Sequence, residues 1–326
     1  MSRVFIFEYY SGGGQADELL PDMLAEEGGA ILTAIVSDFL EAGVEVLTTC
    51  DTRTELDLFA AKVRWVRPGE DMPTIFDEIA AQADQVLVIA PETEGQLLEW
   101  VQRVRRLGAG SLNAEPAAIE LCGDKLALAE HLARAGVPTV PTHESMAGLK
   151  LPVVTKPRTG AGCQKTFLIR DRWQLDMVPA GGDRVYQPWV PGSAASASLI
   201  VHGKQIQPLL PGEQLVEEAG ALIYCGGRLP LPGPLGERAM DLAIRAARAV
   251  PGLGGFVGVD LILGDLPEQD RVVEINPRVT ASYVGLRKLC QMPLAKAMLD
   301  PRVRLTWSSQ ALRFDPEGRV VWMETI

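Results

Sequence analysis

The residues whose types and spacing could most directly take part in chemistry are Asp260, Glu274 and Asn276. They interrupt apolar runs with two carboxylates and one amide, and hard oxygen donors of this kind suit Mg²⁺ or Mn²⁺. Two carboxylates held close together raise each other's pKa unless a cation lies between them. Mg²⁺ usually keeps several waters and takes further ligands from nucleotide phosphates. The set therefore predicts a metal site that serves a phosphorylated substrate.

The elements that would bring these side chains together form a hairpin. Phe256–Leu263 and Arg271–Ile275 are rich in β-branched residues and flank a turn-rich connection, which is typical of two antiparallel strands. If the connection is symmetric, Asp260 lies opposite Glu274, with Cβ atoms roughly 4.5–5.5 Å apart. Asn276 then shares the face of Glu274, because side chains alternate along a strand. The alternative is an ordinary hairpin with a surface carboxylate on each strand. We favour the metal site because the strands are otherwise apolar.

Arg278 and Lys156 could add positive charge beside such a metal. Arg278 lies on the same side if the strand continues past Asn276, and it offers a forked donor for phosphate or carboxylate. Lys156 ends an apolar strand expected over 152–156 and is followed by the glycine-bearing turn Gly160–Gly162. Glycines let backbone N–H groups approach an anion closely. The order of residues differs from a P-loop, and by itself the turn would be a simple glycine-rich hairpin.

Size and composition limit the classes of protein to which this chain can belong. The 326 residues predict about two domains, and 47% hydrophobic with 22% charged residues is typical of globular proteins. The net charge of −11 argues against a nucleic-acid-coating protein. Five scattered cysteines without a CxxC motif favour reduced thiols. The sequence has no signal-peptide pattern and no apolar run near the ~20 residues of a membrane span. We therefore expect a cytoplasmic protein without nucleic-acid or membrane partners.

The first third of the chain alternates short apolar strands with helical patterns, which predicts a doubly wound parallel sheet that ends near Ser111. In such sheets ligands bind beyond the carboxyl ends of the strands. Glu8 and the loop Ser11–Gly14, which follow the first strand, are therefore a candidate ligand edge, and packing residues with a plain flexible loop are the alternative. The expected strands are 4–7, 44–47, 63–66 and 85–89, and the expected helices are 30–42, 73–83 and 94–107.

The remainder of the chain predicts antiparallel strands covered by helices. One helix is expected over 114–135, punctuated by Gly123, and others over 235–250 and 283–297. His131, His143 and His202 are far apart in the sequence without metal-ligand spacing, so we expect structural or surface roles for them. Besides the hairpin, strands are expected at 152–156, 166–169, 184–190, 195–201, 206–209, 222–224, 312–314 and 320–322.

Taken in order, these segments resemble the ATP-grasp superfamily of carboxylate–amine ligases. The resemblance implies that Lys125, in CGDKLAL, and Lys156, in VVTKPRTGAG, contact the phosphates of ATP. It implies that Gly160 to Gly162 form a flexible loop over those phosphates. Arg278 matches the cation beside the transferred phosphate and would act in catalysis with Lys156. The implied cofactors are ATP and Mg²⁺ or Mn²⁺. The residues that match the family's magnesium ligands are Asp260, Glu274 and Asn276.

The nucleotide hinge and the glycine loop show two departures from the family pattern. Gln187, Trp189 and Val190 resemble the hinge whose backbone meets adenine. Acidic residues are common in that hinge, whereas this chain has Gln187 followed by Pro188, which has no N–H to donate. Cys163 replaces a glycine that many members carry in the loop, so we expect a stiffer loop. The complete set of metal ligands argues against a degenerate member.

The resemblance implies an ATP-grasp fold of mixed α/β (α+β) class in three parts. An N-terminal doubly wound parallel-sheet domain would occupy 1–112, and a small lid would occupy 113–190. A C-terminal antiparallel-sheet domain with the metal site would occupy 191–326. Homodimers are common in this superfamily, and no interface can be recognised in the sequence.

Three short segments, FEYYSGGG, PRVTASYVGL and SAASASLI, resemble the members that join L-glutamate to tyramine in methanofuran biosynthesis. This implies amino-acid and amine substrates: a glutamate carboxylate, activated as an acyl phosphate, and the amine of tyramine or tyrosine. The alternatives are another ATP-grasp amino-acid or cofactor-tail ligase and a non-catalytic ATP-binding module. Thr280 and Ser282 could line the acceptor pocket or cap the helix that follows. The candidate substrate residues are Glu8, Ser11, Gly12, Gly13, Thr280 and Ser282.

Overall fold

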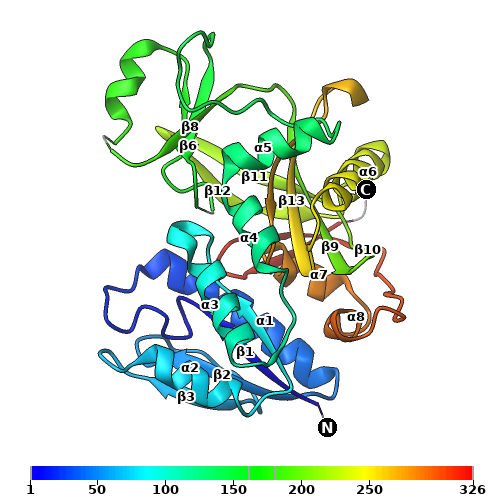
Figure 1. Cartoon of the computed structure of the whole chain (residues 1–326). Coiled ribbons are helices and arrows are strands. Elements are labelled where there is room, and N and C mark those ends of the chain that lie inside the picture. Colours follow the sequence, from blue (N-terminus) through cyan, green and yellow to red (C-terminus); the bar gives the residue numbers. More distant parts are fainter. Residues whose placement is uncertain (1, 161, 180, 325–326) are drawn as a thin grey trace.

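The computed structural model describes residues 2–160, 162–179 and 181–324. In its N-terminal part the strands are β1 (Arg3–Glu8), β2 (Glu45–Asp51), β3 (Lys62–Val66), β4 (Gln85–Ile89) and β5 (Gly110–Ser111), and the helices are α1 (Asp22–Glu41), α2 (Met72–Ala80), the short η1 (Thr93–Gly95) and α3 (Gln96–Arg106). The strands form a parallel sheet in the order β3-β2-β1-β4-β5. Phe7 of β1 packs with α2 and α3, whereas Ile6 packs with α1. Helices therefore cover both faces, which confirms the doubly wound prediction (Figure 1).

Helix α1 begins at Asp22 rather than at Ala30, where the sequence pattern predicts its start. The prediction is wrong because Gly28 and Gly29 interrupt the apolar pattern and glycine disfavours helix interiors. In the fold, Gly28 lies against the carboxylate of Glu8, and a Cβ atom there would come within 2.4 Å of the Glu8 Oε2 atom. The glycine thus allows α1 to approach the end of β1 closely.

The single helix predicted over 114–135 is divided at Asp124. The two helices are α4 (Pro116–Gly123) and α5 (Lys125–Arg134). Asp124 has an extended backbone, and its side chain accepts hydrogen bonds of 3.0 and 3.1 Å from two N–H groups in the first turn of α5. Arg158 holds the same carboxylate at 2.7 Å. This N-cap places Lys125 at the start of α5.

A small antiparallel sheet in the order β7-β6-β8 forms the upper part of Figure 1. Its elements are β6 (Val153–Pro157), β7 (Phe167–Ile169), the short helix η2 (Arg172–Met177) and β8 (Arg184–Pro188). Lys156 of β6 pairs with Val185 of β8. The backbone N–H of Leu222 donates to the carbonyl of Thr166 at 2.8 Å, so this sheet contacts the larger sheet below it.

The large sheet has the order β14-β13-β9-β11-β12-β15-β16, with β10 beside β9. Its strands are β9 (Ser193–His202), β10 (Gln205–Pro208), β11 (Gly212–Ala219), β12 (Ala221–Leu229), β13 (Gly255–Leu263), β14 (Arg271–Asn276), β15 (Ala311–Phe314) and β16 (Val320–Met323). Helix α6 (Gly233–Ala249) packs on one face, where Leu242 joins the cluster that contains Val257. Helices α7 (Ser282–Leu289) and α8 (Ala295–Leu299) pack on the other, where Leu286 joins Phe256. The mixed α/β architecture predicted for the chain is confirmed.

Two elements of this part differ from the prediction. Strand β11 was not expected because its sequence, GEQLVEEA, is rich in acidic residues; it forms by pairing with β9 and β12 and leaves those residues partly exposed. The helix expected over 283–297 is instead the pair α7 and α8. Pro293 lies between them and cannot donate to a helical ladder, and Cys290 pairs with Trp307 instead.

Helix α1 joins the N-terminal sheet to the C-terminal part of the chain. The fully buried carboxylate of Asp38 accepts hydrogen bonds from the Tyr283 hydroxyl at 2.5 Å and from the N–H groups of Leu294 and Ala295 at 3.1 and 2.7 Å. Arg287 forms an ion pair with the same carboxylate. These contacts attach the N-terminal sheet to the C-terminal part of the chain.

Candidate active site

The hairpin of β13 and β14 brings the predicted oxygen donors together. Asp260 pairs with Glu274, as the symmetric hairpin predicts, and a register shift follows directly after this pair. The Asn276 Nδ2 group donates to Asp260 Oδ2 at 3.0 Å, and the Gln214 side chain donates to Asp260 Oδ1 at 2.8 Å. The local strand register therefore gathers two carboxylates and an amide on one face.

Two lysines from different elements converge on this carboxylate pair. The Nζ atoms of Lys156 and Lys125 lie 3.2 and 3.7 Å from Glu274 Oε2, and both lysine side chains are almost fully buried. Although burial opposes it, the two ammonium groups lower the pKa of Glu274. Burial and the Glu274 charge raise the pKa of Asp260. Burial also lowers the pKa of Lys125. The site is thus a compact group of opposite charges on buried side chains.

The donor set fits a hard divalent cation. Mg²⁺ takes a small number of protein oxygens and fills the remaining positions with water and phosphate. Asp260 and Glu274 supply two such oxygens, and Asn276 supplies a third when its amide turns the Oδ1 atom toward them. Across the described part of the chain, no group of three or more His, Cys, Asp or Glu side chains is arranged to hold a metal. The predicted ligand set therefore depends on the amide as well as the two carboxylates.

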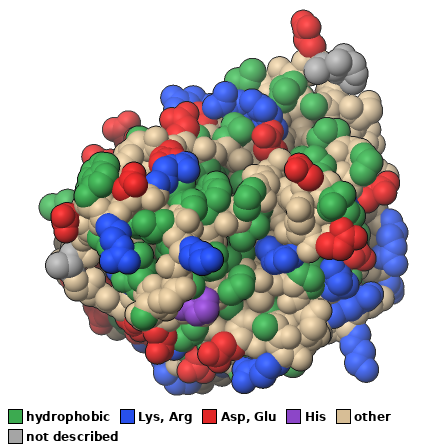
Figure 2. All heavy atoms as spheres, turned by 90° about the horizontal axis from the view of Figure 1, so that it is seen from above, with side chains coloured by type: hydrophobic (Ala, Val, Ile, Leu, Met, Phe, Trp, Pro, Cys, Tyr) green, Lys and Arg blue, Asp and Glu red, His purple; other side chains and the backbone are tan. Residues whose placement is uncertain are grey.

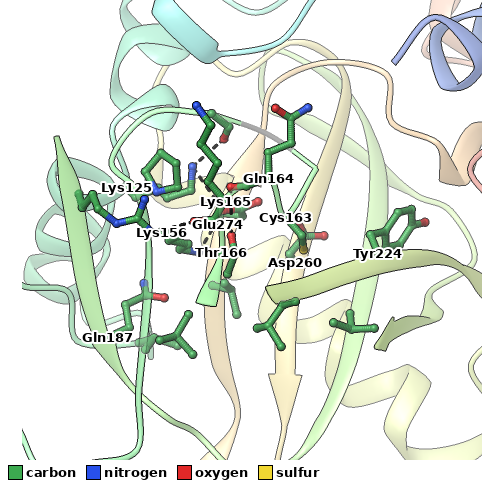
Figure 3. A pocket seen from close by; sticks show the side chains of 18 of the residues that line it. Lys125, Lys156, Cys163, Gln164, Lys165, Thr166, Gln187, Tyr224, Asp260 and Glu274 are labelled. Atoms are coloured by element: carbon green, nitrogen blue, oxygen red, sulfur yellow. Dashed lines mark hydrogen bonds and ion pairs between the residues drawn. The ribbon is translucent and has the colours of Figure 1, made fainter. Parts of the chain in front are cut away.

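A cavity of about 840 Å³ opens beside these charges, between the small sheet and the large one. Cavities of this size match small-molecule sites, which range over roughly 300–1,000 Å³. Figure 3 shows Lys125, Lys156 and Glu274 at one end and Gln187 at the other. The predicted site residues that line the cavity are Lys125, Lys156, Gly160, Gln187, Trp189, Val190, Asp260 and Glu274.

The glycine loop after β6 is held over one end of the cavity. Lys125 Nζ donates to the carbonyl of Gly160 at 2.6 Å. Gly160 and Gly162 have φ of +134° and +68°, which lie in the region that glycine adopts readily. Cys163 has a φ of +57°, which is strained for a side chain with a Cβ. Gly162 belongs to the same turn but does not line the cavity.

The predicted hinge residues lie at the other end of the cavity. Gln187 is buried and its Nε2 group donates to the Thr142 hydroxyl at 2.9 Å. The backbone N–H of Trp189 donates to the carbonyl of Pro152 at 3.0 Å, and the residue as a whole is 38% exposed. The Gln187 side chain is therefore engaged with the protein, while the indole of Trp189 is free to contact a ligand.

Arg278 is held by a residue that the sequence reasoning missed. Its guanidinium donates from Nε to both oxygens of Glu92, at 3.0 and 3.2 Å, and from Nη2 at 3.1 Å. Burial opposes the effect, but the Glu92 carboxylate raises the pKa of Arg278, with Glu27 and Glu274 adding to it. Glu92 follows the carboxyl end of β4, and that position at a strand end was the available signal. The pair spans the N-terminal and C-terminal parts of the chain.

Glu8 and the following turn form a compact structure at the end of β1. Glu8 is 3% exposed, and its Oε2 atom accepts from the Ser11 N–H and the Ser11 hydroxyl, both at 2.6 Å. Burial raises the pKa of Glu8 to about 7, against the effect of these bonds. A Cβ at Gly12 would lie 2.1 Å from the Glu8 carbonyl, and Gly13 has a φ of +92°. Both glycines are therefore required by the turn itself.

Thr280 and Ser282 form a hydroxyl network rather than a helix cap. Their oxygen atoms lie 2.8 Å apart, and Ser282 Oγ lies 3.0 Å from Ser198 Oγ on β9. Helix α7 begins at Ser282 after Ala281 and has no side-chain cap. The network joins the start of α7 to the large sheet, close to the Gly258 and Asn276 positions of the hairpin, because a Cβ at Gly258 would lie 2.9 Å from Thr280.

On the face of the molecule seen from above, Lys and Arg side chains lie among acidic and apolar ones (Figure 2). Among the described residues, no helix combines the length and apolar character needed to cross a membrane. His131 and His202 each bond a backbone carbonyl, at 2.7 and 2.8 Å, as expected of structural histidines.

Comparisons with known proteins agree with this geometry. Residues 122–282 match an ATP-grasp domain model, and residues 44–119 match a pre ATP-grasp 3 domain model. The tyramine–L-glutamate ligase of Methanocaldococcus fervens is 27% identical over 297 residues, covering 87% of this chain and 89% of the relative. The corresponding ligase of Methanocaldococcus jannaschii is 25% identical over 288 residues, covering 87% and 84%. The crystal structure of an ATP-grasp superfamily protein from Archaeoglobus fulgidus is 25% identical, with a TM-score of 0.74 and coverage of 96% and 92%.

Proposed function

This chain belongs to the ATP-grasp superfamily of carboxylate–amine ligases, and we propose that it joins L-glutamate to the amine of tyramine or tyrosine in methanofuran-type cofactor biosynthesis. The observation that carries the proposal is the meeting of Lys125 and Lys156 with the Asp260–Glu274 pair at one end of a cavity of about 840 Å³. The names of the two archaeal relatives support the choice of substrates.

In the proposed reaction the glutamate carboxylate attacks the γ-phosphate of ATP, giving ADP and an acyl phosphate. The amine nitrogen then attacks the acyl carbon, the bond to phosphate breaks, and an amide, inorganic phosphate and a proton are released. Phosphoryl transfer of this kind is accelerated mainly by positioning and by stabilising the charge on the transferred group. The chain must therefore supply cations, a closed cavity and defined orientations.

Lys125, Lys156 and Arg278 are the proposed cations. The two lysines are buried beside Glu274, so in a low-dielectric site their charge acts strongly on a phosphate. Asp260, Glu274 and Asn276 would hold Mg²⁺ or Mn²⁺, which when bound neutralises phosphate charge. Lys125 and Lys156, which both lie beside Glu274, would contact the phosphates. The residues assigned to catalysis are Lys156 and Arg278.

The loop that contains Gly160 and Gly162 is proposed to close over the phosphates. Its contact with Lys125, at 2.6 Å from Nζ to the Gly160 carbonyl, couples the loop to a phosphate-binding group. Closure would exclude water, which otherwise hydrolyses an acyl phosphate. At the opposite end, Gln187, Trp189 and Val190 are proposed to border the adenine.

The substrates are proposed to lie at the topological switch point of the parallel sheet. Ligands of such sheets bind at the carboxyl ends of the strands where the strand order reverses, here between β1 and β4. Glu8 ends β1 opposite Ile89 of β4, and Glu92 follows β4 and reaches Arg278. The residues proposed to contact the acid or the amine are Glu8, Ser11, Gly12, Gly13, Thr280 and Ser282.

The acidic residues of this region favour a substrate that carries an ammonium group. Glu8 contacts the neutral donors of Ser11, and burial raises its pKa to about 7. Burial also raises the pKa of Glu27, on the facing side of α1, while Arg278 opposes that shift. A protonated amine between these carboxylates would stabilise their charged forms. Either carboxylate could then accept the proton that the amine loses before it attacks.

We also propose that the chain divides into domains at residues 112 and 190, that it is located in the cytoplasm and that it forms a homodimer. Residue ranges 1–112, 113–190 and 191–326 follow the three sheets, whose strands run over 3–111, 153–188 and 193–323. Small-molecule substrates are in keeping with a ligase of this superfamily. Sedimentation equilibrium of the full chain would distinguish a dimer from a monomer.

The test is ADP release from ATP and Mg²⁺ with L-glutamate, with and without tyramine or tyrosine, with the products identified by mass spectrometry. A glutamyl amide that forms only when both substrates are present would support the proposal and identify the amine. Turnover with another acid or amine would keep the ligase and replace these substrates. ATP binding without ADP release for any substrate pair would favour a non-catalytic ATP-binding module.

A further inference from the structure

The ion pair of Glu92 and Arg278 has a geometry that suits more than charge neutralisation. Both side chains are nearly buried, with exposures of 4% and 12%. The Nε and Nη2 groups of Arg278 meet the two oxygens of Glu92 side-on at 3.0–3.2 Å, which is a two-pronged arrangement with charged donor and acceptor. Such a pair fixes the plane of the guanidinium as well as its position.

The arrangement leaves two N–H donors of the guanidinium available for a ligand. Arginine has five N–H donors. Glu92 takes the Nε donor and one on Nη2, and the Val279 carbonyl takes one on Nη1 at 3.1 Å. One N–H on each terminal nitrogen therefore has no acceptor among the described residues. Two such donors suit two oxygens of a phosphoryl group.

Glu92 is itself held in place by the end of β4. It precedes the tight turn η1, in which the Gly95 N–H donates to the Glu92 carbonyl at 3.2 Å. A Cβ at Gly123 would lie 3.7 Å from the Glu92 Cβ, in ordinary van der Waals contact, so α4 packs beside Glu92. The neighbouring Thr93 reaches the glycine loop, where its Oγ1 atom lies 3.5 Å from a Cβ built at Gly160. One turn therefore connects Arg278 to the loop proposed to cover the phosphates.

We propose that Glu92 is a positioning residue that orients Arg278 so that its two remaining N–H donors face the transferred phosphoryl group. The proposal rests on the role proposed for Arg278. Glu92 follows a strand of the N-terminal sheet, so it can orient Arg278 only when that sheet packs against the C-terminal part. A different role for the pair would be simple attachment of these two parts. The two roles predict different kinetics.

Glu92→Gln is the informative variant, because it keeps the side-chain shape and removes the charge and one bond of the fork. In amide formation from ATP, Mg²⁺, L-glutamate and tyramine, we expect kcat to fall by up to about 100-fold, the order of loss caused by misplacing a reacting group. The KM for ATP should change by less than about twofold, because the lysine contacts remain. Glu92→Asp keeps the charge and should recover part of the loss.

A double-mutant cycle separates positioning from other effects. In an Arg278→Lys background, Glu92→Gln should change kcat by less than about twofold, since lysine has no fork to orient. A loss of kcat by the same factor in both backgrounds would overturn the proposal. Unchanged kcat in Glu92→Gln, together with a large loss in Arg278→Lys, would overturn it while leaving the proposed function intact.

Asp38→Asn is the matched control for attachment of the two parts. Asp38 is also a buried carboxylate that joins α1 to the C-terminal part, but its hydrogen-bond partners Tyr283, Leu294 and Ala295 are not proposed site residues. We expect a lower unfolding midpoint with kcat unchanged within about twofold. A loss of kcat in Asp38→Asn equal to that in Glu92→Gln would favour simple attachment and overturn the proposal.

A readout that is independent of turnover distinguishes this inference from the proposed function. In ¹⁵N NMR of the full chain, the Arg278 Nε–H should be protected from solvent exchange in the wild-type protein and exposed in Glu92→Gln. Protection that is equal in both proteins would overturn the positioning role. Loss of protection in a protein that makes no amide would retain the positioning of Arg278 by Glu92 and place the failure in the proposed reaction.

Discussion

The two sides of the candidate active site are built in different ways. On the nucleotide side, Asp260 and Glu274 face each other within one hairpin, so strand register alone brings them together. On the substrate side, Glu92 meets Arg278 across 186 residues of sequence, and their contact depends on how whole parts of the chain pack. The comparison teaches that strand pairing brings the carboxylates of the proposed metal site together, whereas tertiary packing places Arg278 and fixes its orientation.

The largest effect is expected from removing Glu274, the centre of the nucleotide side. Glu274→Ala takes away a proposed metal ligand and the carboxylate that both lysines contact. Amide formation should fall by at least about 1,000-fold, because the charge on the transferred phosphoryl group is no longer offset. Steady-state ADP release with saturating Mg²⁺ measures the effect, and thermal unfolding should still show a cooperative transition.

Glu268→Ala is the matched control, because Glu268 is an exposed carboxylate in the connection between the same two strands. Its rate should equal that of the wild-type protein. A near-normal rate for Glu274→Ala would remove the metal assignment and with it the contrast between the two sides.

A smaller loss is expected for Lys156, which contributes one of several cations. Lys156→Ala should lower kcat by about 100-fold, the order of loss for a single group that stabilises transition-state charge. The KM for ATP should rise as well, because the lysine would contact phosphate in both the ground state and the transition state. Initial rates over a range of ATP concentrations measure both quantities. Lys150→Ala, at an exposed lysine, is the control; equal kinetics for the two variants would exclude Lys156 from the site.

The sequence predicted the nucleotide side because its signals are local. A lysine at the end of an apolar strand and a symmetric hairpin are visible within short windows, and the fold confirms the Asp260–Glu274 pairing. The sequence did not identify Glu92 and Glu27 as site residues, because an acidic residue in a loop or on a helix is usually solvated. Only the packing of α1 and the end of β4 against the C-terminal part buries them. The break between two helices at Asp124 was not predicted for a related reason, since the capping contacts of Asp124 exist only once α5 has formed.

The pH dependence of stability tests the substrate side. The folded-state pKa of Glu8 is about 7, above the ordinary value of 4.5, because the side chain is buried. A raised carboxyl pKa means that the folded chain holds the proton more tightly than the unfolded chain. The stability from this group is fully present below pH 4.5 and is lost as the pH rises through 7, with a total on the order of 3 kcal/mol.

Urea unfolding of the wild-type protein and Glu8→Gln at pH 5 to 8 measures this contribution. The variant should lose less stability than the wild-type protein as the pH rises. Asp38, whose pKa burial raises to about 6, contributes the same trend to both proteins, so their difference isolates Glu8. Parallel curves would show that Glu8 is charged in the folded chain. Added tyramine should stabilise the wild-type protein more than Glu8→Gln at pH 8 if this carboxylate receives the ammonium group.

The smallest effect is expected at Cys163, where the glycine loop departs from the family pattern. Its φ of +57° is accessible to glycine without strain, so Cys163→Gly should change the free energy of unfolding by no more than about 1 kcal/mol. A looser loop would admit water to the acyl phosphate, and the ratio of ADP released to amide formed should rise by about two- to threefold. Phe59→Gly is the matched control, because Phe59 has a φ of +56° and lies outside the cavity. A ratio that stays at the wild-type value in Cys163→Gly would mean that side chains around the cavity, and not the loop backbone, exclude water. The orientation of Arg278 and the exclusion of water would then both depend on tertiary packing. The pairing of β13 with β14 would account only for the charge of the two carboxylates.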